Sequence, residues 1–562
     1  MEKQNFKNST IYQIYTKSFK DSNGDGLGDI NGVRQKLDYL ADLGVDYLWL
    51  TPFFTSPMND NGYDVADYTA IDPVFGTMED VEALIREAKT HGIGLMFDMV
   101  FNHTSTAHAW FQRALQGDEK YMNYYIFRDG EPDTPPTNWE SKFGGNAWEY
   151  VPHLHKWYLH LFDVTQADLN WDNPEVREEL KKVIRFWKEK GIRGFRFDVV
   201  NLISKPEILE NDTTGDGRRF YTDGPHVHEY LQELVRDTGI QDMVTVGEMS
   251  STTLDNCIRY TNPDLEKKEL SMVFHFQHLK VDYKDGNKWE LKAPDYGELK
   301  NLFTTWQLAM QEKNGWEAVF WCNHDQPRIV SRLGDDRKYW KESAKMLATC
   351  IHLMRGTPYL FQGEEIGMTN ACYDTIEDYR DVESTNYYEI MLQNGKSAGE
   401  ALEILSRRSR DNGRTPMQWT GEQEAGFTEG ISWLKVPENH TYINVEKEGK
   451  EQDSILVYYK RLIQLRKEKK IIADGEIAFM HQEDLSVLAY RRTLGKQRLL
   501  VYNNLTDQEV RLKTQELDSK FSYLIGNYQD WQRATEEDQA LVLRPYESIV
   551  LADSAVDTNI SK

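Results

Sequence analysis

Three acidic residues each end an apolar run that is typical of a β-strand. A strand that stops on a carboxylate presents that group at the edge of its sheet. In a parallel barrel all such edges lie on one rim, where barrel enzymes build their active sites. A carboxylic acid held beside a carboxylate is what hydrolysis of a glycosidic bond requires. These acids therefore predict acid–base and nucleophilic chemistry on a polar, uncharged bond. They are Asp198 at the end of GFRFD (194–198), Glu248 at the end of MVTVGE (243–248) and Asp325 at the end of AVFWCNHD (318–325).

The elements that must position these acids alternate between strand-like and helix-like runs. Amphipathic stretches such as MEDVEALIREAKTHG and PEVREELKKVIRFWKEKG separate most of the strand-like runs, and Pro or Gly punctuates their ends. Apolar strands that alternate with helices indicate a parallel sheet, and eight such units predict an α/β fold of the (β/α)8 TIM-barrel type. The eight runs are TIYQIYTKSF (10–19), VDYLWLT (45–51), IGLMFDMV (93–100), GFRFDVV (194–200), MVTVGEM (243–249), LSMVFHF (270–276), AVFWCNH (318–324) and PYLFQGEE (358–365).

Two segments depart from this alternation. Residues 104–170 follow the third strand-like run and are rich in Trp, Asn, Gly and Pro, which predicts a small inserted domain over the rim. Residues 480–562 contain VLAYRR, RLLVYNN and ALVLRPYESIVLA with turn residues between them. That pattern predicts a C-terminal antiparallel β-sandwich domain. The catalytic barrel is then expected over residues 1–103 and 171–479.

Composition narrows the possible partners. The 562 residues include 66 basic and 91 acidic side chains, for a net charge of −25, which disfavours nucleic acid or an anionic membrane surface as a partner.

No run approaches the roughly 20 apolar residues of a membrane span, and the N-terminus lacks an apolar signal core. Four scattered cysteines without a CxxC pair argue against a disulfide framework or a zinc site. We expect a cytoplasmic protein, either a monomer or a weak homo-oligomer.

The segment DSNGDGLGD (21–29) alternates side-chain oxygens as calcium loops do, and Gly26 allows its tight turn. It is not an EF-hand, because Gly32 stands where the twelfth-position glutamate would be. The alternative interpretation is a metal-free Asp/Gly turn. A structural Ca²⁺ would be held by the side chains of Asp21, Asn23, Asp25 and Asp29 and by the carbonyl of Leu27.

Five blocks then appear in a characteristic order, and together they resemble the α-amylase family, glycoside hydrolase family 13. The strings NGYDVADY, ESKFGG and RDNGRTPMQW are similar to the oligo-1,6-glucosidase branch, whose calcium loop the segment 21–29 also resembles. Longer strings, DVTQADLNWDNPEVR, FYTDGP, VGEMSSTT, CIRYTNPD, HLKVDY and RDVES, resemble bacterial trehalose-6-phosphate hydrolases. The five blocks are DMVFNH (98–103), QADLN (166–170), GFRFDVV (194–200), GEM (247–249) and NHD (323–325).

The resemblance implies a role for each acid. Asp198 matches the nucleophile, which must be ionised, and Arg196 is expected on the same face of the strand, where a guanidinium lowers a carboxyl pKa. Glu248 matches the acid/base, whose pKa must be raised so that it holds a proton for the leaving oxygen. Asp325 matches the third acid of the family, which binds sugar hydroxyls.

The resemblance also implies a sugar pocket and a phosphate contact. His103 and His324 match residues that bind hydroxyls of the cleaved sugar, and Asp60 with Arg410 matches a pair that closes the blind end of the pocket. The aromatic contacts would be Tyr63 as the platform, with Phe143 and Phe162. Two lysines in HLKVDYKDGNKWELK match phosphate contacts, Lys280 and Lys288.

We therefore predict a cytoplasmic retaining hydrolase that splits α,α-trehalose 6-phosphate into glucose and glucose 6-phosphate. Its partner would be this small phosphorylated disaccharide, with no organic cofactor, nucleic acid or membrane. The first alternative is an oligo-1,6-glucosidase acting on isomaltose-type sugars, which would share the catalytic residues. A transglycosylating isomerase is a further alternative. A non-catalytic transporter partner would need lost carboxylates and a membrane anchor.

Overall fold

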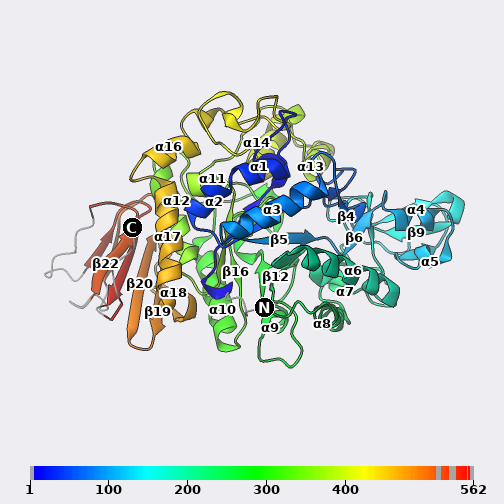
Figure 1. Cartoon of the computed structure of the whole chain (residues 1–562), viewed down its shortest axis with the longest axis horizontal. Coiled ribbons are helices and arrows are strands. Elements are labelled where there is room, and N and C mark those ends of the chain that lie inside the picture. Colours follow the sequence, from blue (N-terminus) through cyan, green and yellow to red (C-terminus); the bar gives the residue numbers. More distant parts are fainter. Residues whose placement is uncertain (1–5, 514–520, 531–539, 554, 557–562) are drawn as a thin grey trace.

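An eight-stranded sheet forms the centre of the computed structural model, with its strands in the order β13-β12-β11-β5-β2-β1-β17-β16 (Figure 1). Every pairing in it is parallel, and a parallel bridge between Val273 and Glu317 joins its two end strands. The predicted (β/α)8 barrel is confirmed, and each predicted strand-like run overlaps one barrel strand. The structure describes residues 6–513, 521–530, 540–553 and 555–556. The barrel strands are β1 (Ile11–Ile14), β2 (Tyr47–Leu50), β5 (Gly94–Met99), β11 (Gly194–Phe197), β12 (Val244–Met249), β13 (Met272–His275), β16 (Ala318–Val319) and β17 (Thr357–Phe361).

Apolar side chains cover both faces of these strands. Trp49 and Leu50 in β2, and Phe195 and Phe197 in β11, are all buried. Such continuous apolar runs are what a parallel sheet enclosed by helices requires. A polar side chain in this setting is costly unless it finds partners. The few polar residues on the strands are therefore informative.

The helices begin and end where local sequence chemistry places them. α3 (Met78–Thr90) starts with a capping box between Thr77 and Asp80. α6 (Pro174–Lys190) starts with a proline and ends at Gly191, which has a positive φ. The other barrel helices are α1 (Ile30–Gln35), α2 (Leu37–Leu43), α8 (Val227–Thr238), α9 (Leu254–Thr261), α10 (Tyr296–Glu312), α11 (Ile329–Leu333), α12 (Trp340–His352) and α17 (Ile455–Glu468).

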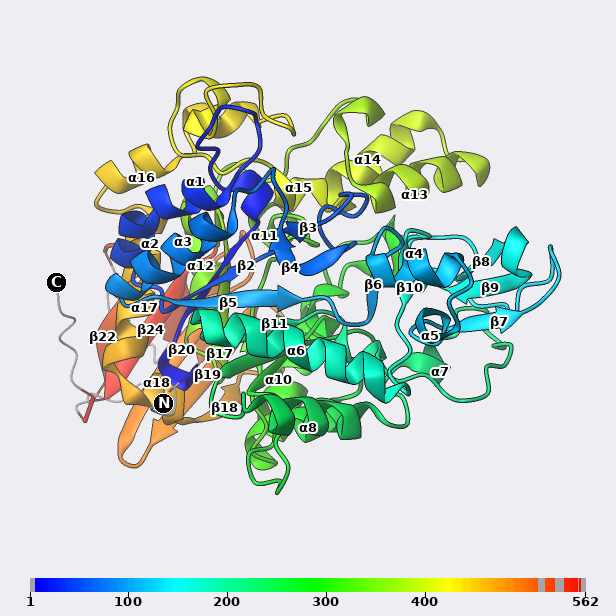
Figure 2. The same cartoon turned by 45° about the vertical axis from the view of Figure 1, so that its right-hand side comes forward.

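The chain between β5 and β11 leaves the barrel and builds separate sheets. β6 pairs with β10, and β7, β9 and β8 form a three-stranded antiparallel sheet. In Figures 1 and 2 β5 points toward these cyan elements, so they stand over the carboxyl ends of the barrel strands. Their bounds are β6 (His103–Ser105), α4 (Ala109–Leu115), α5 (Glu119–Met122), β7 (Phe127–Asp129), β8 (Trp148–Val151), β9 (Lys156–Leu159) and β10 (Gln166–Asp168).

Two helices on the same side of the barrel, α13 and α14, were not predicted. They pack with the hairpin β14–β15, in which the ring of Trp289 stacks on Tyr387 with centroids 4.7 Å apart. Figure 2 shows α13, α14 and α15 above the inserted elements, so both groups flank the rim. The bounds are β14 (Tyr283–Lys284), β15 (Asn287–Leu291), α13 (Val382–Gln393), α14 (Ala398–Arg408) and α15 (Asp411–Arg414).

The last part of the chain forms the predicted antiparallel β-domain. β18, β19, β20, β24 and β22 make a five-stranded sheet, and β21 pairs with β23. α12 contacts this sheet at the end of the barrel away from the rim (Figure 1). Residues 1–5 of the predicted barrel and residues 514–520, 531–539, 554 and 557–562 of the predicted C-terminal domain lie outside the described residues. The strands are β18 (Glu476–Met480), β19 (Val487–Leu494), β20 (Gln497–Asn504), β21 (Val510–Lys513), β22 (Phe521–Gly526), β23 (Ala540–Leu543) and β24 (Ser548–Asp553).

The remaining strands and α-helices are short: β3 (Phe54–Thr55), β4 (Asp67–Ile71), α7 (Arg218–Tyr221), α16 (Val445–Lys450) and α18 (Lys470–Asp474). Among the described residues, no helix combines the length and apolarity needed to cross a membrane.

Candidate active site

Two of the strand-end acids come from neighbouring strands of the barrel. Phe197 of β11 pairs with Gly247 of β12 in parallel register, so the next residues, Asp198 and Glu248, stand side by side at the rim. Asp325 follows β16, farther round the barrel. The side chains of Asp198 and Glu248 are only 10% and 11% exposed, and that of Asp325 is 28% exposed. The first two carboxyls therefore face a largely desolvated space, and the third is the most open.

One buried guanidinium holds the pair together. Arg196 Nη1 donates to Asp198 Oδ1 at 2.7 Å and to Asp98 Oδ1 at 2.6 Å, and Nη2 contacts the Glu248 carboxylate. Arg196 lies two residues before Asp198, and its side chain is 1% exposed. Three carboxyls thus share one positive charge, which favours keeping a proton within the group.

The charge state of Asp198 follows from this crowding. Its pKa is raised to about 7: burial raises it most, Arg196 opposes the rise, and the neighbouring charges of Asp98 and Asp325 add to it. The expected contact with Arg196 is present. Arg196 lowers the Asp198 pKa as expected, but burial and two further carboxylates outweigh this guanidinium, so the net shift is upward.

Asp98 was not among the predicted site residues, although it opens the block DMVFNH. Its side chain is fully buried at the end of β5. Besides Arg196, it accepts hydrogen bonds from Trp49 Nε1 at 3.0 Å and Tyr63 Oη at 2.9 Å. Asp98 therefore orients both the arginine and the aromatic platform. A carboxylate inside an apolar strand was the signal that could have identified it.

Asp325 is held by a histidine and two arginines. The side chain of Gln13 donates to His324 Nδ1 at 2.7 Å, which leaves Nε2 as the proton-bearing nitrogen, 3.2 Å from Asp325 Oδ2. Arg414 donates to Asp325 Oδ1 at 2.8 Å and Arg410 at 3.3 Å. Burial by itself raises the Asp325 pKa, but His324 and the two arginines outweigh it and hold the pKa below its usual range. Asp325 is therefore an anion throughout the physiological range.

His324 is neutral in this setting because burial lowers its pKa to about 3. Its ring stacks on Tyr63 with centroids 5.0 Å apart and an interplanar angle of 3°. Tyr63 thus lies flat against a buried histidine, beside a carboxylate. Such a surface suits the apolar face and the hydroxyl edge of a pyranose.

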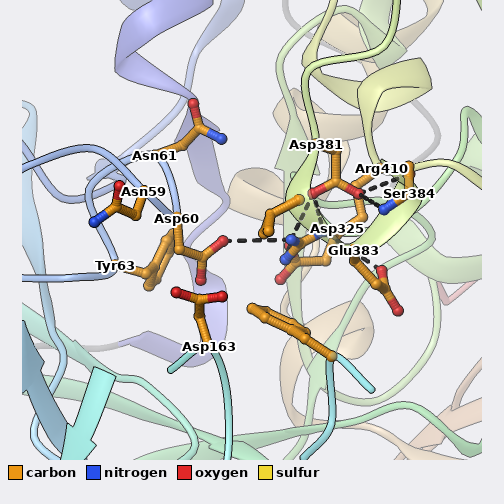
Figure 3. Close-up of polar contacts among 12 residues, drawn as sticks. Asn59, Asp60, Asn61, Tyr63, Asp163, Asp325, Asp381, Glu383, Ser384 and Arg410 are labelled. Atoms are coloured by element: carbon orange, nitrogen blue, oxygen red, sulfur yellow. Dashed lines mark hydrogen bonds and ion pairs between the residues drawn. The ribbon is translucent and has the colours of Figure 1, made fainter. Parts of the chain in front are cut away.

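A second ionic group surrounds Arg410, which also contacts Asp325 (Figure 3). Arg410 Nη2 lies 3.3 Å from Asp60 Oδ1 and 2.5 Å from Asp381 Oδ1, and Arg410 Nε lies 3.5 Å from Glu383 Oε2. Burial raises the pKa of Asp60 to about 7, and Arg410 opposes that rise. The predicted Asp60–Arg410 pair is thus an ion pair, and Asp381 and Glu383 extend it.

The remaining predicted sugar contacts gather on the inserted side of the site. His103 is buried, burial lowers its pKa to about 4, and its ring lies 5.2 Å from that of Phe162. Phe143 meets Phe162 edge to face at 5.7 Å, and Arg410 lies over the Phe143 ring at 4.9 Å. These aromatic rings form a wall between the histidine and the Arg410 ion pair.

The two predicted phosphate lysines lie in different surroundings. Lys288 Nζ is 2.5 Å from Glu383 Oε2, so its charge is compensated within the Arg410 group. Lys280 has no carboxylate within ion-pairing distance in the described part of the chain. Burial lowers the Lys280 pKa, and so does nearby Arg218. Lys280 and Lys288 therefore share no ion-pair partner among the described residues.

The predicted metal loop is folded into a succession of tight turns. Asp21 accepts from the backbone N–H groups of Asn23, Gly24 and Gly26 and from the Thr428 hydroxyl. Asn23 and Asp25 each accept from the backbone N–H two residues on, and Asp29 accepts from Ser22 and Gly32. Asn23, Asp25 and Asp29 keep lone pairs for a cation, and Leu27 keeps its carbonyl oxygen, whereas the four hydrogen bonds to Asp21 use its four lone pairs. No cluster of three or more His, Cys, Asp or Glu suited to a metal occurs within the described residues. Any ion here would therefore rely on Asn and carbonyl oxygens as well.

Several residues of this site escaped prediction for a common reason. Each acts on another side chain rather than presenting a strand-end acid. The signals available were a glutamine in a buried strand for Gln13, and proximity to Arg410 in the sequence RDNGR for Arg414. The motif RDVES contains Asp381 and Glu383. The residues missed, besides Asp98, are Gln13, Arg414, Asp381 and Glu383.

Known proteins resemble this chain in both sequence and structure. Residues 13–475 match the profile described as "Alpha amylase, catalytic domain", and residues 487–550 match "Alpha-amylase SusG C-terminal domain". The trehalose-6-phosphate hydrolase of Escherichia coli (strain K12) is 51% identical over 97% of this chain and 98% of that protein. The oligo-1,6-glucosidase of Bacillus cereus is 45% identical over 98% and 99%. The crystal structure of Bacillus licheniformis trehalose-6-phosphate hydrolase aligns with a TM-score of 0.92 and 51% identity, covering 97% of this chain and 99% of that one.

Proposed function

The chain belongs to the α-amylase family of glycoside hydrolases, and we propose that it hydrolyses α,α-trehalose 6-phosphate to glucose and glucose 6-phosphate with retention of configuration. The single observation that carries the chemistry is the pair Asp198 and Glu248 bridged by Arg196. Similarity along nearly the whole chain to a trehalose-6-phosphate hydrolase supports the substrate.

In the first step Asp198 attacks the anomeric carbon, and the bond from that carbon to the leaving oxygen breaks. Glu248 gives its proton to that oxygen, so the leaving sugar departs as an alcohol and a covalent glycosyl ester remains on Asp198. In the second step Glu248 takes a proton from water, which displaces Asp198 and releases glucose. The group holds three carboxyls against one guanidinium. That imbalance supports a state with one proton in the group before the reaction starts.

The other residues bind and orient the sugar. Asp325, an anion beside the neutral His324, is suited to accept hydrogen bonds from adjacent hydroxyls of the cleaved glucose. His103 offers a further neutral contact, and Tyr63 offers the ring on which that sugar lies. The ion pair of Asp60 with Arg410 blocks extension beyond one residue, which favours removal of a single terminal glucose.

The oligo-1,6-glucosidase alternative shares these residues and differs only at the leaving sugar. The observation that favours a phosphorylated leaving group is a half-buried lysine beside the rim, Lys280, that lacks a carboxylate partner among the described residues. An uncharged isomaltose-type substrate would bring no negative group to pair with the Lys280 ammonium.

We also propose a structural Ca²⁺ in the loop from Asp21 to Asp29 and a cytoplasmic location. The oxygens left free on Asn23, Asp25 and Asp29 support the ion, which would offset most of the negative charge of the loop and fix it without entering the reaction. Four free cysteines suit a reducing compartment. The proposed chemistry uses side chains and water and needs no organic cofactor.

The test is a comparison of trehalose 6-phosphate, trehalose and isomaltose, with the anomer of the first glucose read by NMR. We expect trehalose 6-phosphate to have the highest kcat/KM and the first-formed glucose to be the α-anomer. Initial β-glucose would contradict double displacement. A preference for isomaltose would establish the alternative.

A further inference from the structure

The strand that carries Glu248 loses one partner strand at the level of that acid. β11 pairs with β12 as far as Phe197 and Gly247. The chain of β11 then turns out of the sheet, and Val199 has a positive φ of 32°. β12 continues to Met249, where its ladder partner is β13. On the side of β11, the backbone around Glu248 therefore needs hydrogen-bond partners from outside the sheet.

One side chain takes the place of the missing strand. Asn201 is fully buried; its Nδ2 donates to the Ser250 carbonyl at 2.9 Å, and its Oδ1 accepts from the Ser250 N–H at 2.9 Å. A hydrogen-bonded pair of strand residues exchanges the same two bonds. Ser250 lies two residues after Glu248, and Ser251 has a positive φ of 56°. A serine keeps that conformation only where its surroundings hold it, so Asn201 fixes the turn directly after the acid.

Asp223 connects this contact to the elements around it. Its Oδ1 accepts from Asn201 Nδ2 at 3.2 Å and from Tyr260 Oη at 2.8 Å. Its Oδ2 accepts from Thr252 Oγ1 at 2.7 Å and from Asn256 Nδ2 at 2.8 Å. The Asp223 N–H also donates to the Asn201 carbonyl at 2.9 Å. One carboxylate, with all four lone pairs in use, thus holds Asn201, the turn after β12 and α9 together.

Backbone packing fixes the place of Asp223. It has a positive φ of 50°, which aspartate and asparagine tolerate better than most residues. A Cβ on the next residue, Gly224, would lie 1.9 Å from the Ser204 carbonyl oxygen. Only glycine fits there, so this turn lies directly against the chain at Ser204. The string FYTDGP (220–225) therefore builds a rigid support for the carboxylate.

The place of the end of β12 matters because of what Glu248 must do. Arg196 contacts the Glu248 carboxylate, but the direction of that carboxyl also depends on the backbone that carries it. A proton donor must lie within hydrogen-bond reach of the leaving oxygen. A misplacement of about 1 Å can slow a reaction about a hundredfold.

We infer that Asn201 and Asp223 are positioning residues for proton transfer by Glu248, because they hold the end of β12 where its carboxyl reaches the leaving oxygen. The inference rests on the proposed role of Glu248 as the proton donor. It does not depend on which sugar leaves, since both residues act through the backbone after the acid. Loss of either residue should therefore reproduce part of the loss of Glu248, rather than lower all activities alike.

The experiment measures kcat/KM on two uncharged substrates that differ in their need for a proton. The leaving group of a dinitrophenyl α-glucoside departs without one, whereas that of phenyl α-glucoside needs one. The test variants are Asn201→Ala and Asp223→Gly, since glycine accepts the φ of position 223 and only the carboxylate is lost. Asp223→Asn is the conservative variant. Asp133→Gly, an exposed aspartate that also has a positive φ, 65°, is the matched control, and Glu248→Gln is the reference.

Asn201→Ala and Asp223→Gly should lower kcat/KM about tenfold to a hundredfold on phenyl α-glucoside and less than about threefold on the dinitrophenyl glucoside. Glu248→Gln should show the same selectivity more strongly, and Asp133→Gly should change neither value. Asp223→Asn should recover most of the loss, because its oxygen can still accept from Asn201 while its amide donates to the Thr252 hydroxyl. Partial unfolding does not produce this pattern, because it reduces the amount of active enzyme equally for both substrates.

The inference and the proposed function can fail separately. If Glu248→Gln is selective but Asn201→Ala and Asp223→Gly lose activity equally on both substrates, or lose none, the inference is overturned. An Asp223→Asn variant as impaired as Asp223→Gly would overturn the part assigned to Asp223. If Glu248→Gln is itself not selective, its proposed role is wrong and the inference fails with it. A wild type that prefers a disaccharide other than trehalose 6-phosphate would contradict the proposed substrate, and selective variants would still support the inference.

Discussion

Arg196 sets the electrostatics of the reacting carboxyls. Its guanidinium touches Asp98, Asp198 and Glu248, and its own side chain is almost wholly buried. A buried charge shared in this way leaves a net negative group that attracts both a proton and the positive charge developing at the anomeric centre. The arginine therefore tunes two carboxyls that need opposite protonation states.

Replacement of the two acids should separate their roles. Asp198→Asn should abolish turnover of every substrate, because no glycosyl ester can form. Glu248→Gln should retain the first step on an aryl glucoside with a good leaving group, which departs without a proton. Pre-steady-state release of the aryl alcohol is the measurement. Equal loss in both variants would contradict this division of roles.

The pH profile should report the Asp198 carboxyl. A protonated Asp198 cannot attack, so kcat/KM on an uncharged aryl glucoside should fall as the pH drops below about 7, the pKa of Asp198. Arg196→Met removes a positive charge, which favours the protonated acid and raises this pKa. The acidic limb should therefore move to higher pH, with a lower maximum.

Arg196→Lys is the control for this profile. It keeps the charge, so its acidic limb should stay closer to that of wild type even if the loss of the guanidinium fork lowers the rate. An Arg196→Met limb that stays in place or moves to lower pH would show that Arg196 does not set the ionisation of the nucleophile.

At the scale of elements, the ends of the barrel strands supply the three acids, and the connections between strands supply most of the other site residues. The connection after β17 contributes Asp381, Glu383 and Arg410, and the inserted segment contributes Phe143. Loops carry such specificity because their sequence can vary without disturbing the scaffold. Differences in substrate among relatives of one fold are therefore expected in these connections.

The loop from Asp21 to Asp29 gives a prediction at this scale. Chelation of divalent metal should lower Tm, because an ion that binds only the folded state stabilises it by mass action. Asp21→Ala should abolish the effect of the chelator and remove about one equivalent of bound Ca²⁺, measured by elemental analysis. Metal content unchanged in Asp21→Ala would show that the loop is a metal-free turn.

At the scale of the whole molecule, the C-terminal domain is attached through hydrogen bonds as well as apolar packing. Arg492 of β19 is buried and donates at 2.6 Å to the carbonyl of Leu353, just after α12, and to that of Gly475. Burial lowers the pKa of Arg492 to about 10, yet its donors satisfy carbonyls that would otherwise lack partners. The β-domain thus supplies a hydrogen-bond donor to the C-terminal end of α12.

Arg492→Met should therefore destabilise the protein without impairing catalysis. The orphaned carbonyls should cost about 1–3 kcal/mol each, offset in part by relief of the buried charge. We expect Tm to fall by several degrees, with kcat/KM unchanged at low temperature. Arg491→Met, on the opposite face of the same strand, is the control and should change Tm less. An equal fall in both variants would indicate a general effect on the strand.

Much of this architecture could be predicted because local chemistry determines it. Strand runs, capping residues such as Thr77 and the positions of Asp198 and Glu248 depend on neighbours in sequence. The helices α13 and α14 were missed because no barrel repeat predicts an extra helical pair. The net pKa shift of Asp198 could not be predicted because it depends on burial and on carboxylates from other strands, among them Asp98.

The sequence by itself determined the barrel, its order of elements and the rim on which the acids lie, since periodicity and strand-end residues are local properties. Only the tertiary structure decided which charges meet. It adds Asp381 to the predicted Arg410–Asp60 pair, gives Lys288 a carboxylate partner and places Lys280 with other cations. These outcomes depend on how distant connections pack over one rim. Charge interactions act through space, so spacing along the chain does not reveal them.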